Sequence, residues 1–166
     1  GKKVGLWYVH KSVTPWLRIA IPFVHRVFSA SYESFRINTP KKTVTGHGID
    51  TDFFTPDSGV SRGDHILSVG RLSKSKRHDL VIHAAALVNR ELRIAGEGEE
   101  QSSLEKLAQS LGAKATFLGG LSQSGLRDEY RQAAYLVHAS ETGSLDKVVL
   151  EALATDCPVI TTSTAY

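Results

Sequence analysis

Short apolar runs alternate with segments of helical periodicity along the chain from residue 64 onward. The apolar runs have the length of strands and are bounded by Gly, Ser or Thr; they are HILSVG (65–70), LRIAG (92–96), ATFLG (115–119), YLVHA (135–139) and CPVIT (157–161). Between them, apolar residues recur at helical spacing, in groups that begin at Leu80, Leu104 and Leu126, and a fourth helix is expected over residues 148–154. Strands that are apolar throughout are buried on both faces, so this alternation predicts a parallel α/β sheet covered by helices on both sides.

The first part of the chain has a less regular pattern. Residues 4–9 (VGLWYV) are interpreted as a buried strand and residues 42–45 as a second short strand. A Thr-Pro pair favours a helix start, so residues 14 to about 28 are expected to be helical, with a kink or break at Pro22. Gly, Pro, Asp and Ser punctuate residues 46–63, which are interpreted as a linker.

Composition narrows the class of protein. The 166 residues are 41% hydrophobic and 22% charged, as in a globular domain long enough to bury a core. A single cysteine, Cys157, excludes an internal disulfide and a cysteine-based zinc site, and it favours a reducing compartment. The apolar run 16–28 is too short for a transmembrane helix and contains Arg18 and Arg26. Because the sequence has no Met, we expect an internal piece of a longer protein.

Charge is distributed unevenly. Residues 1–42 carry eight Lys and Arg side chains and one acidic side chain, Glu33, whereas the rest of the chain carries 12 basic and 16 acidic ones. Such asymmetry is typical either of a solvated surface or of a surface that meets an anionic partner, such as lipid head groups or nucleic acid.

Two cations follow the first strand of the regular region. Arg71 comes directly after that strand, and Lys76 lies near the start of the next helix. Ligands of open α/β sheets bind beyond the carboxyl ends of the strands, where helix N-termini favour anions. Arg71 and Lys76 could therefore converge on one anion, such as a diphosphate; a solvated basic loop is the alternative.

A second candidate loop follows the fourth strand. Small residues around Gly143 let backbone N–H groups approach a ligand, and Asp146 and Lys147 flank the start of the next helix. Glu151 lies one turn inside that helix. It is either a surface carboxylate or a bidentate acceptor for a vicinal diol such as a ribose.

Other motifs are incomplete or absent. The segment GEGEEQ (96–101) resembles a dinucleotide fingerprint, but Gln101 replaces the third glycine and its three acidic residues would repel a pyrophosphate. We therefore reject a nicotinamide-dependent dehydrogenase and interpret the glycines as a turn beside a cleft. The sequence contains no P-loop, HExxH or G-x-S-x-G motif. Among the histidines, His10 is a candidate because it follows a strand.

Five segments together resemble a known family. They are HGIDTDFFTP (47–56), ILSVGRLSKSKRHDLVIHAAALV (66–88), LRIAGEGEEQSSLEKLAQSLG (92–112), ATFLGG (115–120) and VVLEALATDCPVITT (148–162). In order and spacing they resemble family 4 glycosyltransferases of GT-B fold. The resemblance implies a Rossmann-like doubly wound parallel sheet, which is the C-terminal donor-binding domain, and a partial second α/β domain. Residues 1–56 are then the remnant of the acceptor-side domain plus a linker, and residues 57–166 are the nucleotide-sugar-binding domain, truncated after its fifth strand.

The resemblance also implies roles for individual residues. Arg71 and Lys76 fall where the family neutralises the donor diphosphate, and Glu151 falls on the second Glu of a Glu-x7-Glu motif, which binds the nucleotide ribose. His10 falls at the place of a histidine that reaches the donor sugar, so His10, Arg71 and Lys76 are the candidate catalytic residues. Near the nucleobase pocket the resemblance places Gly119 and Gly120.

The chain departs from the family at the first acid of that motif. Gly143 stands eight residues before Glu151, where the family has a Glu that contacts the donor sugar, and Glu141 lies two residues too early. We expect a variant loop to supply replacement donor contacts from Gly143, Ser144, Asp146 and Lys147.

The resemblance implies an enzyme that moves a sugar from a nucleoside diphosphate to an acceptor hydroxyl with retention of configuration, in polysaccharide or glycolipid synthesis. It implies no cofactor and no metal ion. The alternatives are a noncatalytic nucleotide-sugar-binding module and a GT-B nucleotide-sugar epimerase. Expected partners are the donor, a saccharide or lipid-linked acceptor and, through the basic first 42 residues, an anionic membrane, but no nucleic acid. We expect a cytoplasmic protein, peripheral at the inner membrane face, and we expect the 166 residues alone to be inactive.

Overall fold

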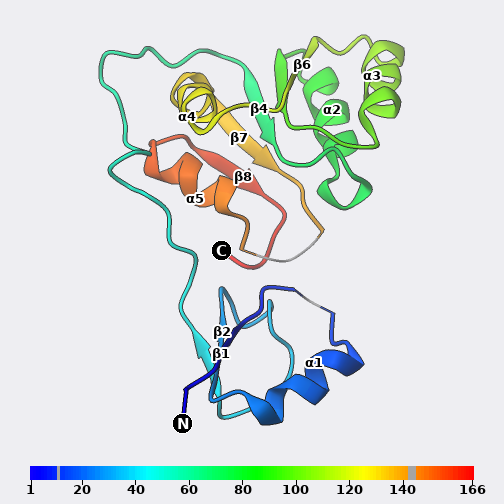
Figure 1. The fold of residues 1–166 in the computed structure, drawn as a ribbon. Coiled ribbons are helices and arrows are strands. Elements are labelled where there is room, and N and C mark those ends of the chain that lie inside the picture. Colours follow the sequence, from blue (N-terminus) through cyan, green and yellow to red (C-terminus); the bar gives the residue numbers. More distant parts are fainter. Residues whose placement is uncertain (11, 142–144) are drawn as a thin grey trace. The chain divides into compact units, whose positions relative to one another are not determined.

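The computed structural model describes residues 1–10, 12–141 and 145–166 (Figure 1). The chain forms two compact units, one built mainly from residues 1–48 and the other from residues 49–141 and 147–162. None of the described helices is long and apolar enough to cross a membrane.

The larger unit contains a sheet of five parallel strands. The strands are β4 (Ile66–Val69), β5 (Leu92–Ala95), β6 (Ala115–Gly119), β7 (Tyr135–His138) and β8 (Val159–Thr161). They are connected through η2 (Lys74–Lys76), α2 (His78–Leu87), α3 (Gln101–Ser110), α4 (Gln123–Gln132) and α5 (Lys147–Ala154). The prediction of a parallel α/β sheet is confirmed, with each apolar run forming one strand.

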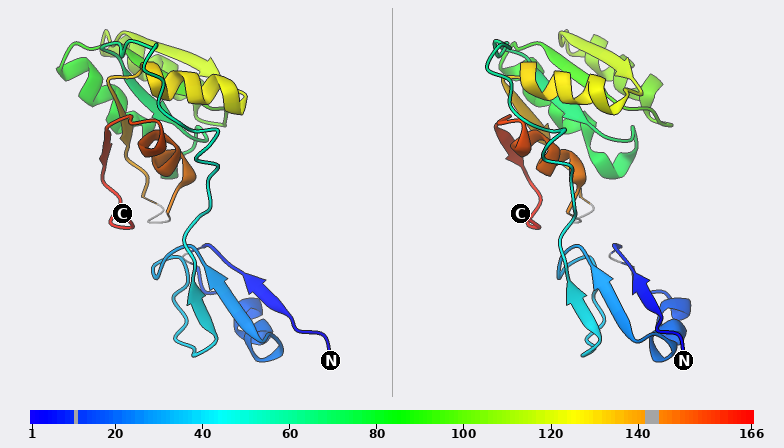
Figure 2. Two further views of the ribbon diagram at one scale, coloured as in Figure 1. Left: turned by 90° about the vertical axis from the view of Figure 1, so that its left-hand side faces the viewer. Right: turned by 60° about the vertical axis from the view of Figure 1, so that its left-hand side comes forward.

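Helices cover both faces of this sheet (Figures 1 and 2), and a hydrophobic cluster lies on each face. Along β4, Ile66 belongs to the cluster formed with α2 and α3, whereas Leu67 belongs to the cluster formed with α4 and α5. Successive side chains of a strand point to opposite faces, and all four residues of β4 are buried. The continuous apolar run therefore arises from a strand covered on both sides.

The strand order creates a switch point beside β4. The order in the sheet is β6-β5-β4-β7-β8, so the chain runs outward on one side of β4 and then returns to its other side. In such sheets the crevice for a ligand lies outside the carboxyl ends of the two strands where the order reverses. Here these strands are β4 and β7, which end at the loops beginning with Gly70 and Ala139.

The smaller unit contains three parallel strands in the order β1-β2-β3. These are β1 (Gly5–Trp7), β2 (Arg26–Ser29) and β3 (Lys42–Val44), with α1 (Pro15–Ala20) and the 3₁₀ turn η1 (Ile21–Phe23) before β2. The predicted helix start is confirmed, because Thr14 accepts a hydrogen bond from the Leu17 N–H at 3.1 Å. The expectation that this helix reaches residue 28 is wrong. Pro22 has no N–H for a further helical bond, and the chain turns into the central strand, where Val27 is fully buried.

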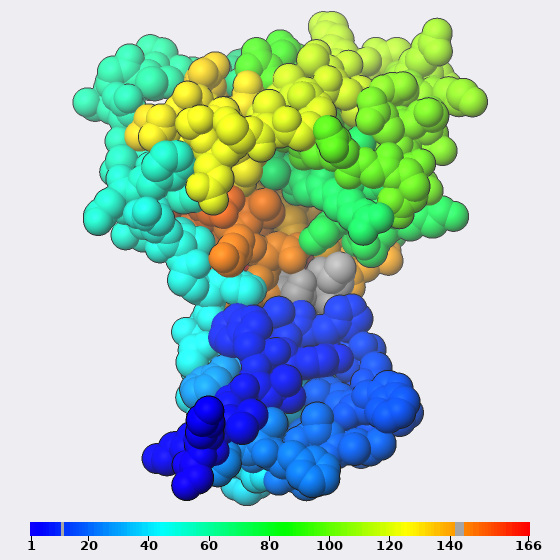
Figure 3. Space-filling model, in the orientation of Figure 1, coloured from blue at the N-terminus to red at the C-terminus, as the bar shows by residue number. Residues whose placement is uncertain are grey.

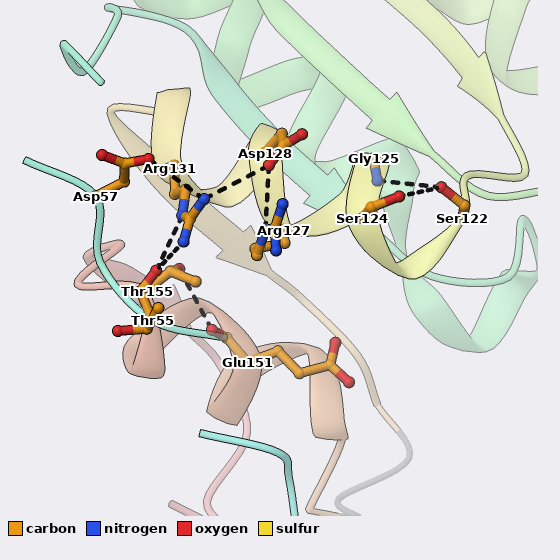
Figure 4. A network of polar contacts seen from close by, with 10 residues as sticks. All are labelled: Thr55, Asp57, Ser122, Ser124, Gly125, Arg127, Asp128, Arg131, Glu151 and Thr155. Carbon is orange, nitrogen blue, oxygen red and sulfur yellow. Dashed lines mark hydrogen bonds and ion pairs between the residues drawn. The ribbon is translucent and has the colours of Figure 1, made fainter. Parts of the chain in front are cut away.

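The irregular segment 54–57, at the start of the larger unit, forms hydrogen bonds and packing contacts with α4 (Figure 4). Arg131 donates from Nε and Nη2 to the Thr55 carbonyl at 2.9 and 2.7 Å, and its Nη1 lies 3.6 Å from the Asp57 carboxylate. Next to it, the buried Phe54 ring packs against the Tyr130 ring, with centroids 6.3 Å apart. These contacts hold an irregular segment against the core.

We expect Arg131→Ala to destabilise the chain by about 1–3 kcal/mol, since it leaves a backbone carbonyl without its charged donor. Urea denaturation measures the change. Arg131→Lys is the matched control: it keeps the charge but loses the two-pronged contact, so it should fall between the wild type and the Ala variant. Equal stability of all three proteins would contradict this assignment.

Candidate functional site

Three loops meet at the carboxyl ends of β4, β5 and β6. They are joined by backbone hydrogen bonds from Gly70 N to Ala95 O (3.0 Å), from Leu72 N to Glu97 O (2.9 Å) and from Gly96 N to Gly119 O (2.8 Å). The loops approach so closely that a Cβ on Gly96 would lie 1.9 Å from the Gly70 carbonyl oxygen, and one on Gly98 would lie 2.3 Å from that of Leu72. The two glycines thus let one loop pack on another, which explains them without a dinucleotide fingerprint.

A small cavity of about 190 Å³ opens beside this junction. Glycine backbone and apolar side chains line it: Val69, Gly70, Ala95, Gly96, Gly120, Leu121 and Leu126. Gly120 belongs to this lining, while Gly119 ends β6 with a φ of 66°. The Gly120 N–H also donates to Glu97 Oε1 at 3.3 Å, which ties the second and third loops together. A mostly apolar cavity of this kind suits a small aromatic ring.

The structure places Arg71 and Lys76 at the two ends of the loop that follows Gly70. The Arg71 side chain is 73% exposed and donates to Glu99 Oε2 at 3.3 Å. The backbone N–H of Glu99, together with the charge of Arg71, holds the pKa of the Glu99 carboxyl below its usual value. The stem of Lys76 passes over Gly70, since a Cβ there would lie 3.7 Å from Lys76 Cγ and Cδ. Both cations therefore stand beside the switch point.

The buried histidine His78 lies next to Gly70, at the start of this loop. Its role was not predicted from the sequence. His78 begins α2, is 2% exposed and shares a hydrogen bond of 2.9 Å between its Nδ1 and Ser68 Oγ on β4. Its Nε2 lies 3.8 Å from the position of a Cβ on Gly70. Burial lowers the pKa of His78 below its usual value, so the ring is neutral at pH 7. A polar residue inside a fully buried strand is the sequence signal that could have pointed to such a partner.

His65 provides a second buried imidazole, at the opposite end of β4. Burial is the main reason why its pKa is lowered, and Arg93 adds to the effect. Since both pKa values are lower in the folded than in the unfolded state, the unfolded chain binds protons more readily. Stability is then fully present above about pH 6.5 and is lost as the pH falls below it.

We expect the free energy of unfolding to fall between pH 7 and pH 5, with each of these histidines contributing up to about 1.4 kcal/mol per pH unit. Urea denaturation at several pH values measures the slope, and His65→Gln should make it shallower. His83→Gln is the control, because it removes an exposed imidazole from α2. A slope that is the same in the wild type and in His65→Gln would contradict the prediction for His65.

Arg77 connects the start of α2 with the end of β7. It adopts a left-handed backbone with φ 53°, which favours glycine, and its guanidinium binds the Asp79 carboxylate through Nε (3.1 Å) and Nη2 (3.1 Å). Its Nη1 donates to Glu141, whose backbone N–H donates to the Ser75 carbonyl at 2.9 Å. The Glu141 carboxylate is therefore paired with Arg77 in this structure. A cleft of about 410 Å³ adjoins the pair, lined by Ser73, Lys74, Arg77, His78, Asp79, Glu100, Leu104 and Glu141.

Glu151 lies on α5, as predicted, and is half-buried. Its Oε2 accepts a hydrogen bond of 3.2 Å from the Tyr130 hydroxyl, and burial raises the pKa of the carboxyl above its usual value. Lys147 begins the same helix and is exposed. The Tyr166 hydroxyl accepts a hydrogen bond from the Asp146 N–H at 2.6 Å and donates one to the Asp146 carbonyl at 2.8 Å. The predicted donor contacts Gly143 and Ser144 lie outside the described residues.

His10 lies in the smaller unit, just after β1, and is exposed. Its Nδ1 is 2.8 Å from Ser12 Oγ, and its backbone N–H donates to the Ser34 carbonyl at 3.0 Å. These local contacts fix where the residue sits within its own unit. Its role towards a donor sugar stays a prediction.

Within the described ranges, no three His, Cys, Asp or Glu side chains gather as in a metal site. The expectation that no metal ion or cofactor takes part stays a prediction.

Comparison with known proteins places the chain in a family. The family model described as "Glycosyl transferases group 1" matches residues 53–166. Among curated proteins, the D-inositol 3-phosphate glycosyltransferase of Frankia alni is 35% identical over 144 residues, which are 77% of this chain and 33% of that protein.

Solved structures share the fold. Anabaena HepE, determined with UDP and glucose, superposes with a TM-score of 0.80 at 18% identity, over 96% of this chain and 53% of that one. The catalytic domain of cholesterol-α-glucosyltransferase from Helicobacter pylori is 33% identical, with a TM-score of 0.55 over 60% of this chain and 65% of that domain. The chain spans about a third of the length of the curated relatives it matches.

Proposed function

The chain belongs to the glycosyl transferases of group 1, and from this premise we propose that its protein transfers a sugar from a nucleoside diphosphate sugar to an acceptor hydroxyl with retention of configuration. The observation that carries the proposal is the position of Arg71 and Lys76, two cations at either end of one loop beside the strand-order switch point. A phosphate-bearing ligand is the guest that such a place favours.

The chemistry follows from charge. As the bond between the sugar and the diphosphate breaks, positive charge develops on the sugar and negative charge on the leaving diphosphate. Arg71 and Lys76 stabilise that growing negative charge and act as the main catalytic groups of this unit. His78, neutral and buried behind Gly70, helps to hold the loop that carries them. Charge stabilisation by side chains of this kind makes a metal ion unnecessary in the proposal.

Recognition of the nucleotide is assigned to two further places. The cavity lined by Gly70, Gly96 and Gly120 takes the base, because its lining is mostly apolar and a planar ring can pack against the glycines and the side chains beside them. Glu151 takes the ribose, since a carboxylate accepts two hydrogen bonds from a vicinal diol. The UDP in the Anabaena HepE structure supports a nucleoside diphosphate as the ligand of this fold.

The sugar-binding loop differs from the family pattern, and Asp146 and Lys147 are proposed to contact the donor there. Both flank the start of α5, and the Tyr166 hydroxyl holds the Asp146 backbone in place. The acceptor is proposed to be a saccharide or a lipid-linked saccharide, in polysaccharide or glycolipid synthesis. The basic first 42 residues support an anionic membrane, at the cytoplasmic face, as the place where it is met.

The test has two stages. Thermal-shift measurements with uridine, guanosine and adenosine diphosphates and their sugars should raise the melting temperature for one base, because a ligand that binds the folded state stabilises it. Product analysis with that donor and a panel of saccharide acceptors then separates three outcomes. A new glycosidic bond with the donor's anomeric configuration supports the proposal. An isomerised donor indicates an epimerase, and bound but unreacted donor indicates a noncatalytic module; either result would overturn the proposed transfer.

A further inference from the structure

A buried tyrosine touches the carboxylate assigned to the ribose. The Tyr130 hydroxyl on α4 donates to Glu151 Oε2 on α5 at 3.2 Å. Tyr130 is fully buried, whereas the Glu151 carboxylate is half-buried. In Figure 3 side chains of α5 (orange) reach the surface beside those of α4 (yellow). The hydrogen bond therefore joins the hydrophobic core to a carboxylate at its margin.

Core packing fixes the position of this hydroxyl. The Tyr130 ring belongs to the cluster on the α4 and α5 face of the sheet and packs at a tilt of 60° against the Phe54 ring. A ring held on all sides has one orientation, so its hydroxyl is a rigid donor. The hydroxyl of Thr155, one turn after Glu151, instead donates to the Ala152 carbonyl at 2.7 Å. It also contacts the Glu151 backbone carbonyl, at 3.3 Å (Figure 4). Thr155 thus contacts the helix backbone and leaves the carboxylate to Tyr130.

The hydrogen bond also acts on the charge of the carboxylate. Burial raises the pKa of Glu151, and the hydrogen bond from Tyr130 and the charge of Lys147 act in the opposite direction. A vicinal diol donates two hydrogen bonds, so it is bound best by an ionised carboxylate whose plane is fixed. The hydrogen bond from Tyr130 uses one acceptor position of Oε2, and a carboxylate has further acceptor positions on its two oxygens for a ligand.

We propose that Tyr130 is a positioning residue, which holds the Glu151 carboxylate in the plane that accepts the 2′ and 3′ hydroxyls of the donor ribose. The inference rests on the proposed function, because it takes the ligand of Glu151 to be a ribose. It adds a role for a core residue that contacts no substrate itself.

The experiment removes one oxygen atom. Tyr130→Phe keeps the ring in the core, and calorimetry of the whole protein measures the affinity for the nucleoside diphosphate selected by the thermal-shift panel. We expect the affinity to fall about 10-fold or more, as for the loss of a hydrogen bond to a charged group. The same titration with the 2′,3′-dideoxynucleoside diphosphate should show no difference between variant and wild type, because the hydroxyls that Glu151 binds are absent. Tyr135→Phe, on β7 and outside the site, is the matched control and should leave both affinities unchanged.

The outcomes are distinguishable. An equal loss for the ribose and dideoxyribose ligands would mean that the hydroxyl acts on the fold in general, and it would overturn the positioning role. A second variant tests whether Tyr130 acts through Glu151. In a Glu151→Gln background, Tyr130→Phe should lower the affinity for the nucleoside diphosphate clearly less than it does in the wild type. The same decrease in affinity in both backgrounds would also overturn the proposal. Failure of the wild type to bind any nucleoside diphosphate would overturn the proposed function, and with it the role of Tyr130.

Discussion

Lys76→Ala is expected to lower the rate of sugar transfer by about 10²–10³-fold. The side chain lies against Gly70 at the carboxyl end of β4, where the leaving diphosphate is proposed to bind, and its charge is needed most as that group departs. Charge stabilisation of this kind is stronger in the transition state than in the ground state, so kcat at saturating donor should fall more than donor affinity. Steady-state kinetics with the donor and acceptor identified by product analysis provide the measurement.

Lys74→Ala is the matched control. Lys74 is exposed and lies in the same 3₁₀ turn, two residues before Lys76. Its substitution by Ala therefore removes the same charge from a neighbouring position. It should change the rate by no more than a few-fold, and that change should disappear at high salt. A Lys76→Ala enzyme with wild-type rate and affinity would contradict the assignment of the diphosphate to this loop. Equal losses in both variants would point to a general electrostatic effect of the turn.

The contrast between these two lysines shows what the sequence could and could not predict. The pattern GRLSKSK placed Arg71 and Lys76 after the first strand of the regular region. The mostly apolar run before it identified that strand, because a strand buried on both faces is largely apolar. Which lysine approaches Gly70 depends on the 3₁₀ turn between them, and hydrophobic periodicity does not specify such a turn.

The contacts that sequence reasoning missed are side-chain contacts between different secondary-structure elements. Tyr130 lies in the helical segment that begins at Leu126 and is buried in the core, but its contact with Glu151 depends on how α4 packs against α5. Similarly, Ser68 and His78 are ten residues apart, on a strand and a helix whose relative placement comes only from the sheet. The strand β2 was missed for a different reason. The apolar run from Trp16 to Phe28 is compatible with a helix or a strand, and in the structure the part before Pro22 is helical whereas β2 begins after it.

The second large effect concerns the junction of the loops, where Gly96→Ala is expected to destabilise the protein by about 2–5 kcal/mol. A Cβ there would lie 1.9 Å from the carbonyl oxygen and 2.8 Å from the carbonyl carbon of Gly70, and φ at Gly96 is 142°, which L side chains rarely adopt. The obstacle is backbone, so no side-chain rotation relieves it. The loop after β4 would have to move, and Arg71 moves with it.

Gly112→Ala separates the two causes of that loss. Gly112 also has a positive φ, 61°, but nothing lies within 4 Å of its added Cβ, so the substitution measures the conformational cost alone, about 1 kcal/mol. Urea denaturation compares the stabilities, and the thermal shift produced by the nucleoside diphosphate compares binding. We expect Gly112→Ala to bind like the wild type, and the folded fraction of Gly96→Ala to bind more weakly because the diphosphate loop is displaced. If both variants unfolded at the same urea concentration, the close packing of Gly96 on Gly70 would not be what fixes the loop after β4. Other contacts would then have to hold Arg71 and Lys76 in place.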